Sequence, residues 1–273
     1  MSALTPAKIG QQFGAAARTY ESVAIAQKVA VDRLSTAFRA IDLPAGPILE
    51  IGCGTGLLSR KLHQTWPDRP LICSDISPAM LAACEQNLPR SPQLQFQVLD
   101  GATVWPEPTY AAIASSFALQ WLPDPLASLQ RWQAALVPGG WLLLAVPTAG
   151  SFQVWRQLCE QLQIPFTGHP LPEADELQSV LLRSGQLLKG TCDRLTLPIA
   201  NARSFFRQLK DLGATATAAD PLRPQQFRRL LQAWDQRSQP IEQEFWWGLW
   251  QKTPVPAAIA PVSCPDSRCS LLT

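Results

Sequence analysis

Apolar positions along this chain follow two different periods. Between residues 47 and 146, short apolar runs of strand length alternate with segments in which apolar residues recur at helical spacing. The runs predict strands at 47–51, 71–75, 94–99, 110–116 and 141–146. The intervening segments predict helices at 56–65, 78–86 and 125–136. Because strands that alternate with helices form a parallel sheet, this part predicts a doubly wound α/β fold. Its ligands are expected at the carboxyl ends of the strands.

Helical patterns also precede and follow this alternating part. Thr5-Pro6 is typical of a helix start, and a second helix is expected from about Tyr20 to Ile41. Asp124-Pro125 and Pro138-Gly139-Gly140 are expected to begin and end the helix at 125–136. The later elements are expected as helices at 152–163, 173–184, 202–212 and 225–236, and as strands at 187–197 and 241–252. From Pro254 onward the chain lacks periodicity, and residues 254–273 are expected to form a disordered tail.

Composition narrows the class of protein. With 273 residues, 47% apolar and 16% charged, the chain is expected to form one enlarged globular domain. A net charge of +2 gives no nucleic-acid signal, and no run of 18 apolar residues suggests a membrane span. The seven cysteines contain no Cys-x-x-Cys pair, which disfavours both a zinc site and a disulfide framework. We therefore expect a cytoplasmic protein with reduced thiols, no metal and no membrane or nucleic-acid partner.

A glycine-rich turn follows the first predicted strand. The run Ile48-Leu-Glu-Ile-Gly-Cys-Gly-Thr-Gly56 passes from a buried strand into a helix whose amide groups face the turn. The dinucleotide fingerprint requires glycine at its first, third and sixth positions, whereas here the sixth position is Leu57. Glycines at the first, third and fifth positions resemble those of S-adenosylmethionine (SAM) methyltransferases. An NAD-linked oxidoreductase is therefore disfavoured.

Acidic residues end three successive predicted strands. Glu50 is expected to attract the amino group of SAM, and Asp75 to accept hydrogen bonds from both ribose hydroxyls. Asp100 is expected to accept from the adenine amine. The full set of expected cofactor residues is Glu50, Gly52, Gly54, Gly56, Asp75, Ile76, Met80, Asp100, Gly101 and Ser116. Three acids at neighbouring strand ends are a stronger signal than any one of them, although each one can also cap a turn.

Two further features indicate a substrate site. Gln120 and Trp121 follow the fourth strand and would border the transferred methyl group, although Trp121 could equally be a core residue. Residues 201–237 hold seven basic and three acidic residues, and Arg203, Arg207 and Lys210 share one helical stripe. This face could meet an acidic ligand, or it could be an ordinary solvated surface.

Several segments together resemble the malonyl-[acyl-carrier protein] O-methyltransferase family of biotin synthesis. The resemblance covers most of residues 9–252 and lies in Phe13–Tyr20, Ala118–Trp121, Gly150-Ser151 with Trp155, and Leu209–Thr215. It implies a seven-stranded, mostly parallel Rossmann-like methyltransferase fold with a helical lid, about 199–238, between strands six and seven. The implied parts are an N-terminal helical cap (1–43), a SAM-binding core (44–147), and a remainder containing the lid (148–253).

The resemblance also implies a reaction. SAM would methylate the free carboxyl of a malonyl thioester, early in biotin synthesis, with no side chain acting as a base. The implied positioning residues are Tyr20, Gln120 and Trp121, with Lys210 or Arg207 holding the substrate. An acyl carrier protein would dock on Arg203, Arg207, Lys210, Arg228 and Arg229. The residues leave two alternatives open, another small-molecule methyltransferase and a SAM-binding module without catalysis, and they do not separate malonyl-carrier protein from malonyl-CoA.

Overall fold

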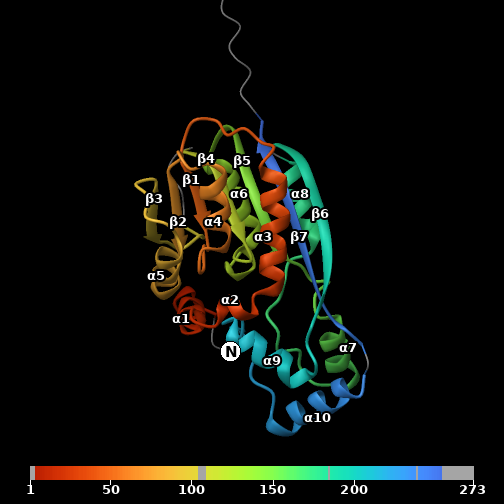
Figure 1. Cartoon of the computed structure of the whole chain (residues 1–273). Helices are drawn as coiled ribbons and strands as arrows, with labels where there is room; N and C mark the ends of the chain where they lie inside the picture. Colours follow the sequence, from red (N-terminus) through yellow and green to blue (C-terminus); the bar gives the residue numbers. More distant parts are fainter. Residues whose placement is uncertain (1–3, 104–108, 184, 238, 254–273) are drawn as a thin grey trace, which may run out of the picture.

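A seven-stranded sheet forms the centre of the computed structural model, which describes residues 4–103, 109–183, 185–237 and 239–253 (Figure 1). Its strands are β1 (Ile48–Ile51), β2 (Leu71–Asp75), β3 (Leu94–Val98), β4 (Tyr110–Ser116), β5 (Leu136–Pro147), β6 (Gly185–Leu197) and β7 (Ile241–Lys252). Their order across the sheet is β3-β2-β1-β4-β5-β7-β6. The first five strands run parallel, and β7 runs antiparallel to both β5 and β6. The predicted α/β class and mostly parallel sheet are confirmed.

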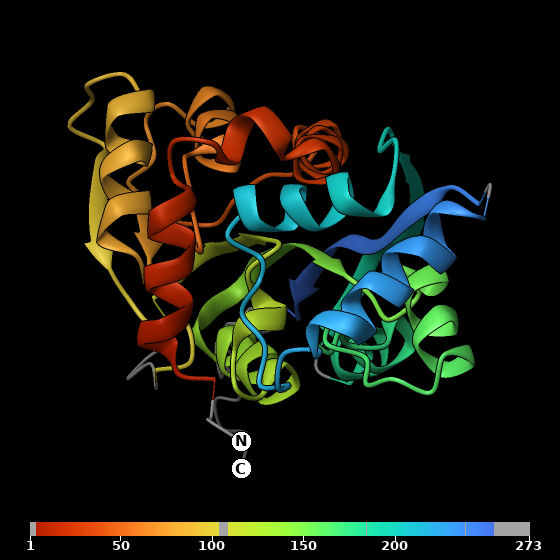
Figure 2. The same ribbon diagram turned by 90° about the horizontal axis from the view of Figure 1, so that it is seen from below.

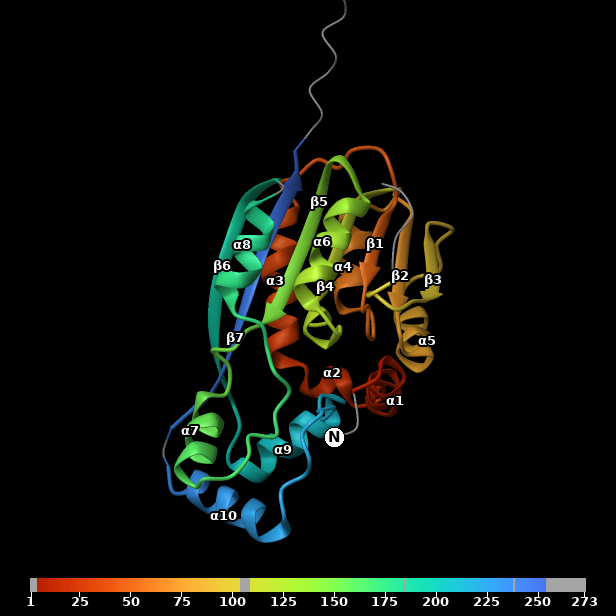
Figure 3. The same cartoon turned by 180° about the vertical axis from the view of Figure 1, so that it is seen from behind.

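Helices cover both faces of the sheet. One face carries α3 (Ile25–Phe38), α4 (Leu57–Thr65) and α5 (Pro78–Asn87), and the other carries α6 (Pro125–Ala135) and α8 (Ala174–Leu182) (Figures 1 and 3). Each face therefore has its own buried core. Leu34 and Leu62 belong to the first core, whereas Trp132 and Leu181 belong to the second. Burial on both faces explains why the central strands β1, β4 and the second half of β5 read as nearly continuous apolar runs.

The remaining helices gather at the carboxyl ends of the parallel strands. They are α1 (Pro6–Ala16), α2 (Tyr20–Val23), α7 (Gln153–Gln161), α9 (Ala202–Asp211) and α10 (Pro224–Asp235). Seen from this end, α9 crosses beneath the sheet between α1 and α10 (Figure 2). Both α9 and α10 are inserted between β6 and β7, which nevertheless pair from Gly185–Lys252 to Leu197–Ile241. The expected helical insertion between strands six and seven is thus present.

Local sequence explains where three of the helices begin. The side-chain oxygens of Thr5, Ser77 and Asp124 accept backbone N–H bonds from the first turns of α1, α5 and α6. Each cap is followed by a proline at the first helical position, where its missing N–H removes no helical bond. The predicted helix starts at Thr5-Pro6 and Asp124-Pro125 are confirmed.

Tertiary contacts divide one predicted helix into two. The single helix expected from Tyr20 to Ile41 is broken at Ala24, which is fully buried and has a non-helical ψ of 57°. The break frees the carbonyl of Val23, which accepts a hydrogen bond from Gln208 Nε2 of α9 at 3.0 Å. A contact with a segment so distant in sequence cannot be read from the periodicity of the leader.

The fifth strand also begins earlier than predicted. It starts at Leu136 rather than at 141, so Pro138-Gly139-Gly140 follows the end of α6 as predicted but lies inside the strand. The pairing with β4 changes register between Tyr110 and Ala112 to accommodate these residues. A bulge of this kind is a usual way to place proline and glycine within a sheet.

Some predictions fall on residues outside the described part of the chain or remain predictions. The expected disordered tail at 254–273, with Cys264 and Cys269, lies outside the described residues. The division of the chain into a helical cap (1–43), a SAM-binding core (44–147) and a remainder with the lid (148–253) stays a prediction. Cys53, Cys73, Cys84, Cys159 and Cys192 are all free thiols. Over the described ranges, the helices are all too short or too polar to cross a bilayer.

Candidate active site

The glycine-rich turn after β1 is built from backbone that only glycine adopts readily. Gly52, Gly54 and Gly56 have φ angles of +74°, +54° and +93°. A Cβ atom on Gly52 would lie 2.3 Å from the Cβ of Ala118, so the turn passes against the segment that follows β4. The N–H groups of Gly52 and Cys53 both donate to the carbonyl of Ser74 at the end of β2. The turn is thereby held between the ends of the two neighbouring strands.

Asp75 fixes the other side of this turn. Its Oδ2 accepts the N–H of Gly54 at 2.9 Å, and its Oδ1 accepts the N–H of Ser77 at 2.8 Å. Burial raises the pKa of this carboxyl to about 6, although both backbone hydrogen bonds act in the opposite direction. Each carboxylate oxygen keeps a further lone pair for a ligand hydroxyl.

A small cavity of about 90 Å³ lies between the turn and α1. Eight of the expected cofactor residues line it, namely Gly52, Gly54, Asp75, Ile76, Met80, Asp100, Gly101 and Ser116. The structure thus brings together residues from the ends of four strands. Pro6, Ile9 and Phe13 of α1 close the cavity on its other side.

Glu50 and Gly56 do not line this cavity. Glu50 is buried behind the turn, where burial raises the pKa of its carboxyl well above the ordinary value and its Oε2 has no partner among the described residues. A Cβ on Gly56 would point toward Cys84 of α5, 3.1 Å from its sulfur. Both residues lie outside the lining of this cavity, and the expected contact of Glu50 with the amino group of SAM stays a prediction.

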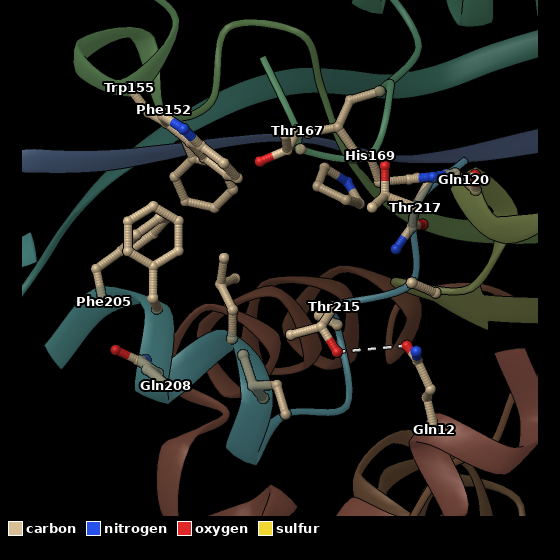
Figure 4. Close-up of a pocket in the computed structure, with 18 of the residues that line it drawn as sticks. Gln12, Gln120, Phe152, Trp155, Thr167, His169, Phe205, Gln208, Thr215 and Thr217 are labelled. Carbon is tan, nitrogen blue, oxygen red and sulfur yellow. Dashed lines mark hydrogen bonds between the residues drawn. The ribbon is translucent and has the colours of Figure 1, made fainter. Parts of the chain in front are cut away.

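A second, larger cavity of about 720 Å³ adjoins the first and is enclosed by α1, α7, α9 and the segments around them. Figure 4 shows aromatic side chains on one wall, including Phe152, Trp155 and Phe205, and polar side chains on the opposite wall, including Gln120 and His169. Lys8 and Arg156 are the cationic lining residues, and no acidic residue lines the cavity within the described ranges. This charge balance favours an anionic ligand.

Four aromatic residues separate the two cavities. Phe13, Tyr20, Phe117 and Trp121 line both of them. Phe13 packs edge-on against Trp121 with ring centroids 5.3 Å apart, and Phe117 has a left-handed φ of +58°. Burial raises the pKa of the Tyr20 phenol, which therefore stays a neutral hydrogen-bond donor. A group passing from one cavity to the other would cross between these rings.

The short helix α2 joins the glycine turn to the rest of the site. Oε1 of Glu21 accepts hydrogen bonds from Thr55 Oγ1 at 2.9 Å and from Arg60 Nη2 at 3.1 Å. Sequence reasoning missed Glu21 because its partners lie more than thirty positions away. The N-terminal helices also bond to the α9 region, through Thr19 Oγ1 to the Asp211 carbonyl at 2.8 Å and through Thr215 to Gln12.

His169 and Arg156 were also missed by the sequence reasoning. The His169 ring stacks on Trp121 with centroids 4.3 Å apart, and its Nε2 lies 2.7 Å from the carbonyl oxygen of Gln120. The Arg156 guanidinium lies 4.2 Å from the centre of the Phe166 ring. The available signals were weak: His169 is one of only two histidines, and Arg156 merely follows Trp155 of the Gly150-Ser151 element.

The predicted basic stripe lies on the outside of the molecule. Arg207 and Lys210 are exposed on α9 and do not line the cavity, whereas Phe205, Gln208 and Leu209 of the same helix do. A role for Lys210 or Arg207 inside the cavity is therefore not supported by their placement. All five expected docking residues are exposed: Arg203, Arg207, Lys210, Arg228 and Arg229.

Comparison with known proteins agrees with this geometry. A family model described as a methyltransferase domain matches residues 48–140. The structure of a candidate methyltransferase from Bacillus halodurans C-125 has the same fold, with a TM-score of 0.60, 15% identity, and coverage of 82% of this chain and 98% of that chain. The chain is a SAM-dependent methyltransferase with a Rossmann-like fold.

Two relatives identify the family. The malonyl-[acyl-carrier protein] O-methyltransferase of Magnetococcus marinus is 33% identical over 83% of this chain and 84% of its own length. The biotin biosynthesis bifunctional protein BioCD of Bordetella avium is 34% identical over 89% of this chain, which spans 52% of that protein. The chain belongs to the malonyl-[acyl-carrier protein] O-methyltransferase family of biotin synthesis.

Proposed function

We propose that this enzyme transfers the methyl group of SAM to the free carboxylate of a malonyl thioester carried by an acyl carrier protein. The observation that carries the proposal is the pair of adjoining cavities. The smaller one holds the glycine turn and Asp75, and the larger one is free of acidic lining residues in the described part and contains Arg156. The relatives' names supply the substrate class, and the reaction would stand early in biotin synthesis.

The small cavity offers the groups that SAM needs. Asp75 would accept hydrogen bonds from the ribose hydroxyls. Asp100 and Gly101 would contact the adenine amine, and the side chains of Ile76 and Met80 would pack against the adenine ring. The buried Ser116 hydroxyl has no partner among the described residues, which fits a ligand contact at that point. No group of residues in the described part has the makeup of a metal site, and the proposed reaction requires none.

The chemistry requires little from the side chains beyond positioning. A malonyl carboxylate is ionised at pH 7, so no general base is needed. When bound, SAM supplies a methyl group already activated by the sulfonium. Tyr20 and Trp121 lie where the two cavities meet and would orient the carboxylate and exclude water. Alignment of this kind can lower a barrier by roughly 7–11 kcal/mol.

Charge assigns different roles to the two sets of basic residues. Arg156 lines the larger cavity and would hold the malonyl carboxylate, a role that the sequence had suggested for Lys210 or Arg207. The stripe of Arg203, Arg207 and Lys210 is exposed and would meet an acidic carrier protein during encounter. In this proposal, α9 with α10 forms a lid that has substrate contacts on its inner face and carrier contacts on its outer face.

A labelled-methyl assay tests the proposal. The purified enzyme should transfer methyl from SAM to malonyl-carrier protein or malonyl-CoA. Transfer only to other carboxylic acids would favour a different small-molecule methyltransferase. A thermal shift with SAM but no turnover on any acyl substrate would point to a non-catalytic SAM-binding module.

Acidification is expected to weaken SAM binding below about pH 6. Asp75 must be a carboxylate to accept the ribose hydroxyls, and its pKa is raised to about 6 by burial. The affinity should therefore be full above pH 6 and fall about tenfold per pH unit below it. Calorimetric titration with SAM between pH 5 and pH 8 measures this change. An Asp75→Asn variant should bind more weakly with a flatter profile, and an unchanged midpoint in that variant would contradict the assignment.

Charge reversal on the outer face of α9 is expected to weaken carrier recognition. The triple change Arg203→Glu, Arg207→Glu and Lys210→Glu should raise KM for malonyl-carrier protein about tenfold at low salt, with kcat nearly unchanged. KM for malonyl-pantetheine, which has no carrier protein, should stay constant. Arg39→Glu, an exposed charge reversal at the end of α3, serves as the matched control. Equal KM values for wild type and the triple variant would remove this surface from the proposal.

A further inference from the structure

Two buried hydrogen-bond acceptors face the large cavity without a partner. They are Oε1 of Gln120 and Nδ1 of His169, and we call them the acceptor pair. Both residues line the larger cavity but not the smaller one, and Figure 4 shows them side by side on its polar wall. A buried acceptor without a donor is unfavourable, so such atoms commonly mark a ligand contact.

The orientation of Gln120 leaves its oxygen free to accept. This side chain is 5% exposed, and its Nε2 donates to the carbonyl of Phe117 at 2.7 Å. Because a carbonyl can only accept, the amide nitrogen must be the end that faces Phe117. The oxygen therefore remains as an acceptor, and it finds no donor among the described residues.

His169 is held in a matching state. Its Nε2 lies 2.7 Å from the backbone carbonyl of Gln120, so this nitrogen carries the proton and Nδ1 is the free acceptor. Stacking on Trp121 fixes the plane of the ring. Burial lowers the pKa of His169, which favours the neutral imidazole with an open lone pair. The charged residues that line the same cavity are Lys8 and Arg156.

A malonyl carboxylate cannot satisfy the acceptor pair, because it also only accepts. The rest of the substrate can: the pantetheine arm that carries a malonyl thioester contains amide N–H donors beyond the sulfur. Trp121 borders the junction with the small cavity, and Gln120 and His169 lie next to Trp121 but line only the larger cavity. A carboxylate at the junction would leave its thioester arm running along the polar wall.

We propose that Gln120 and His169 receive the amide N–H groups of the pantetheine arm and so select pantetheine thioesters over other malonyl thioesters. This inference rests on the proposed function. It assigns Gln120 a contact with the arm, in place of the contact near the methyl group that its sequence position suggested. It also makes His169 a specificity-determining residue.

The test compares three substrates with the wild-type enzyme. They are malonyl-pantetheine, the same thioester with N-methylated amides, and a malonyl alkyl thioester of similar length without amides. Methyl transfer to malonyl-pantetheine should have a kcat/KM about tenfold or more above the other two, the effect of losing a buried hydrogen bond. Equal kcat/KM values for all three would overturn the inference while leaving the proposed function intact. No transfer to any of them, or to malonyl-carrier protein, would instead contradict the proposed function.

A His169→Phe variant adds a second measurement. Phenylalanine keeps the stacking on Trp121 but has no ring nitrogen, so kcat/KM should fall more on malonyl-pantetheine than on the alkyl thioester, and the preference for malonyl-pantetheine should shrink. The matched control is His63→Phe, at the chain's other histidine on α4. An equal loss on both substrates would show that His169 only supports the structure, which would overturn its assigned role.

Discussion

Replacing Gly52 by alanine is expected to reduce SAM affinity by at least a hundredfold. The alanine methyl would lie 2.3 Å from the Cβ of Ala118, a separation that real side chains do not reach, so the turn or the segment after β4 must move. The φ of +74° adds the strain of a left-handed alanine, about 1 kcal/mol. Because Gly52, Gly54 and Asp75 line the same small cavity, a displaced turn would also misplace the Asp75 carboxylate, which we propose to bind the ribose.

Calorimetric titration with SAM measures this effect, and circular dichroism checks that the variant is folded. The matched control is Gly139→Ala. Gly139 has nearly the same φ, +75°, but lies at the amino end of β5, away from both cavities. The control should lose some stability and keep its SAM affinity. If Gly52→Ala bound SAM within threefold of wild type, the close approach to Ala118 would not govern the site.

Replacing Arg156 by glutamine is expected to lower kcat/KM for malonyl thioesters about a hundredfold. A carboxylate that leaves water for this largely apolar cavity needs a charged partner, and Arg156 is a cation placed in the lining. Its Nε is buried and has no hydrogen-bond partner among the described residues, so it is available to a ligand. Glutamine removes the charge together with the guanidinium that lies over the Phe166 ring.

The loss should come mainly from a higher KM, and SAM affinity should not change. Arg156→Lys keeps the positive charge but cannot form the bidentate hydrogen bonds of a guanidinium, so its activity should lie between those of Arg156→Gln and the wild type. Steady-state kinetics on malonyl-pantetheine distinguish the three proteins. Wild-type kinetics in Arg156→Gln would mean that Lys8 or another group holds the carboxylate.

Elements with strong local signals agreed closely with the structure. β2, β4 and β7 match the predicted ranges 71–75, 110–116 and 241–252. β2 and β4 are short, mostly buried runs, and β7 carries apolar Phe245, Trp247 and Leu249 at the period of a strand. The predictions were wrong where distant contacts decide the backbone. Ala24 breaks the leader helix so that Val23 can bond to Gln208, and Pro138 to Gly140 enter β5 through a bulge.

The two cavities of the candidate site also differ in how far the sequence could predict them. The small cavity could be anticipated because the carboxyl ends of neighbouring parallel strands meet at one edge, so Gly52, Asp75, Asp100 and Ser116 must come close together. The large cavity could not, since its walls come from segments whose packing has no local signature. Helical spacing placed Lys210 and Leu209 on different faces of α9, but only packing shows that Leu209 lines the cavity and Lys210 faces outward.

By itself, therefore, the amino-acid sequence determined the α/β class, the glycine turn with its acids, and the family resemblance. These features depend on local periodicity and on the fixed geometry of parallel strands. The tertiary structure alone decided that Glu50 is buried outside the small cavity, that Glu21 ties α2 to the glycine turn, and that Arg156 and His169 line the larger cavity. Those placements depend on how α1, α7 and α9 pack across the end of the sheet, and long-range packing leaves no periodic trace in a single chain.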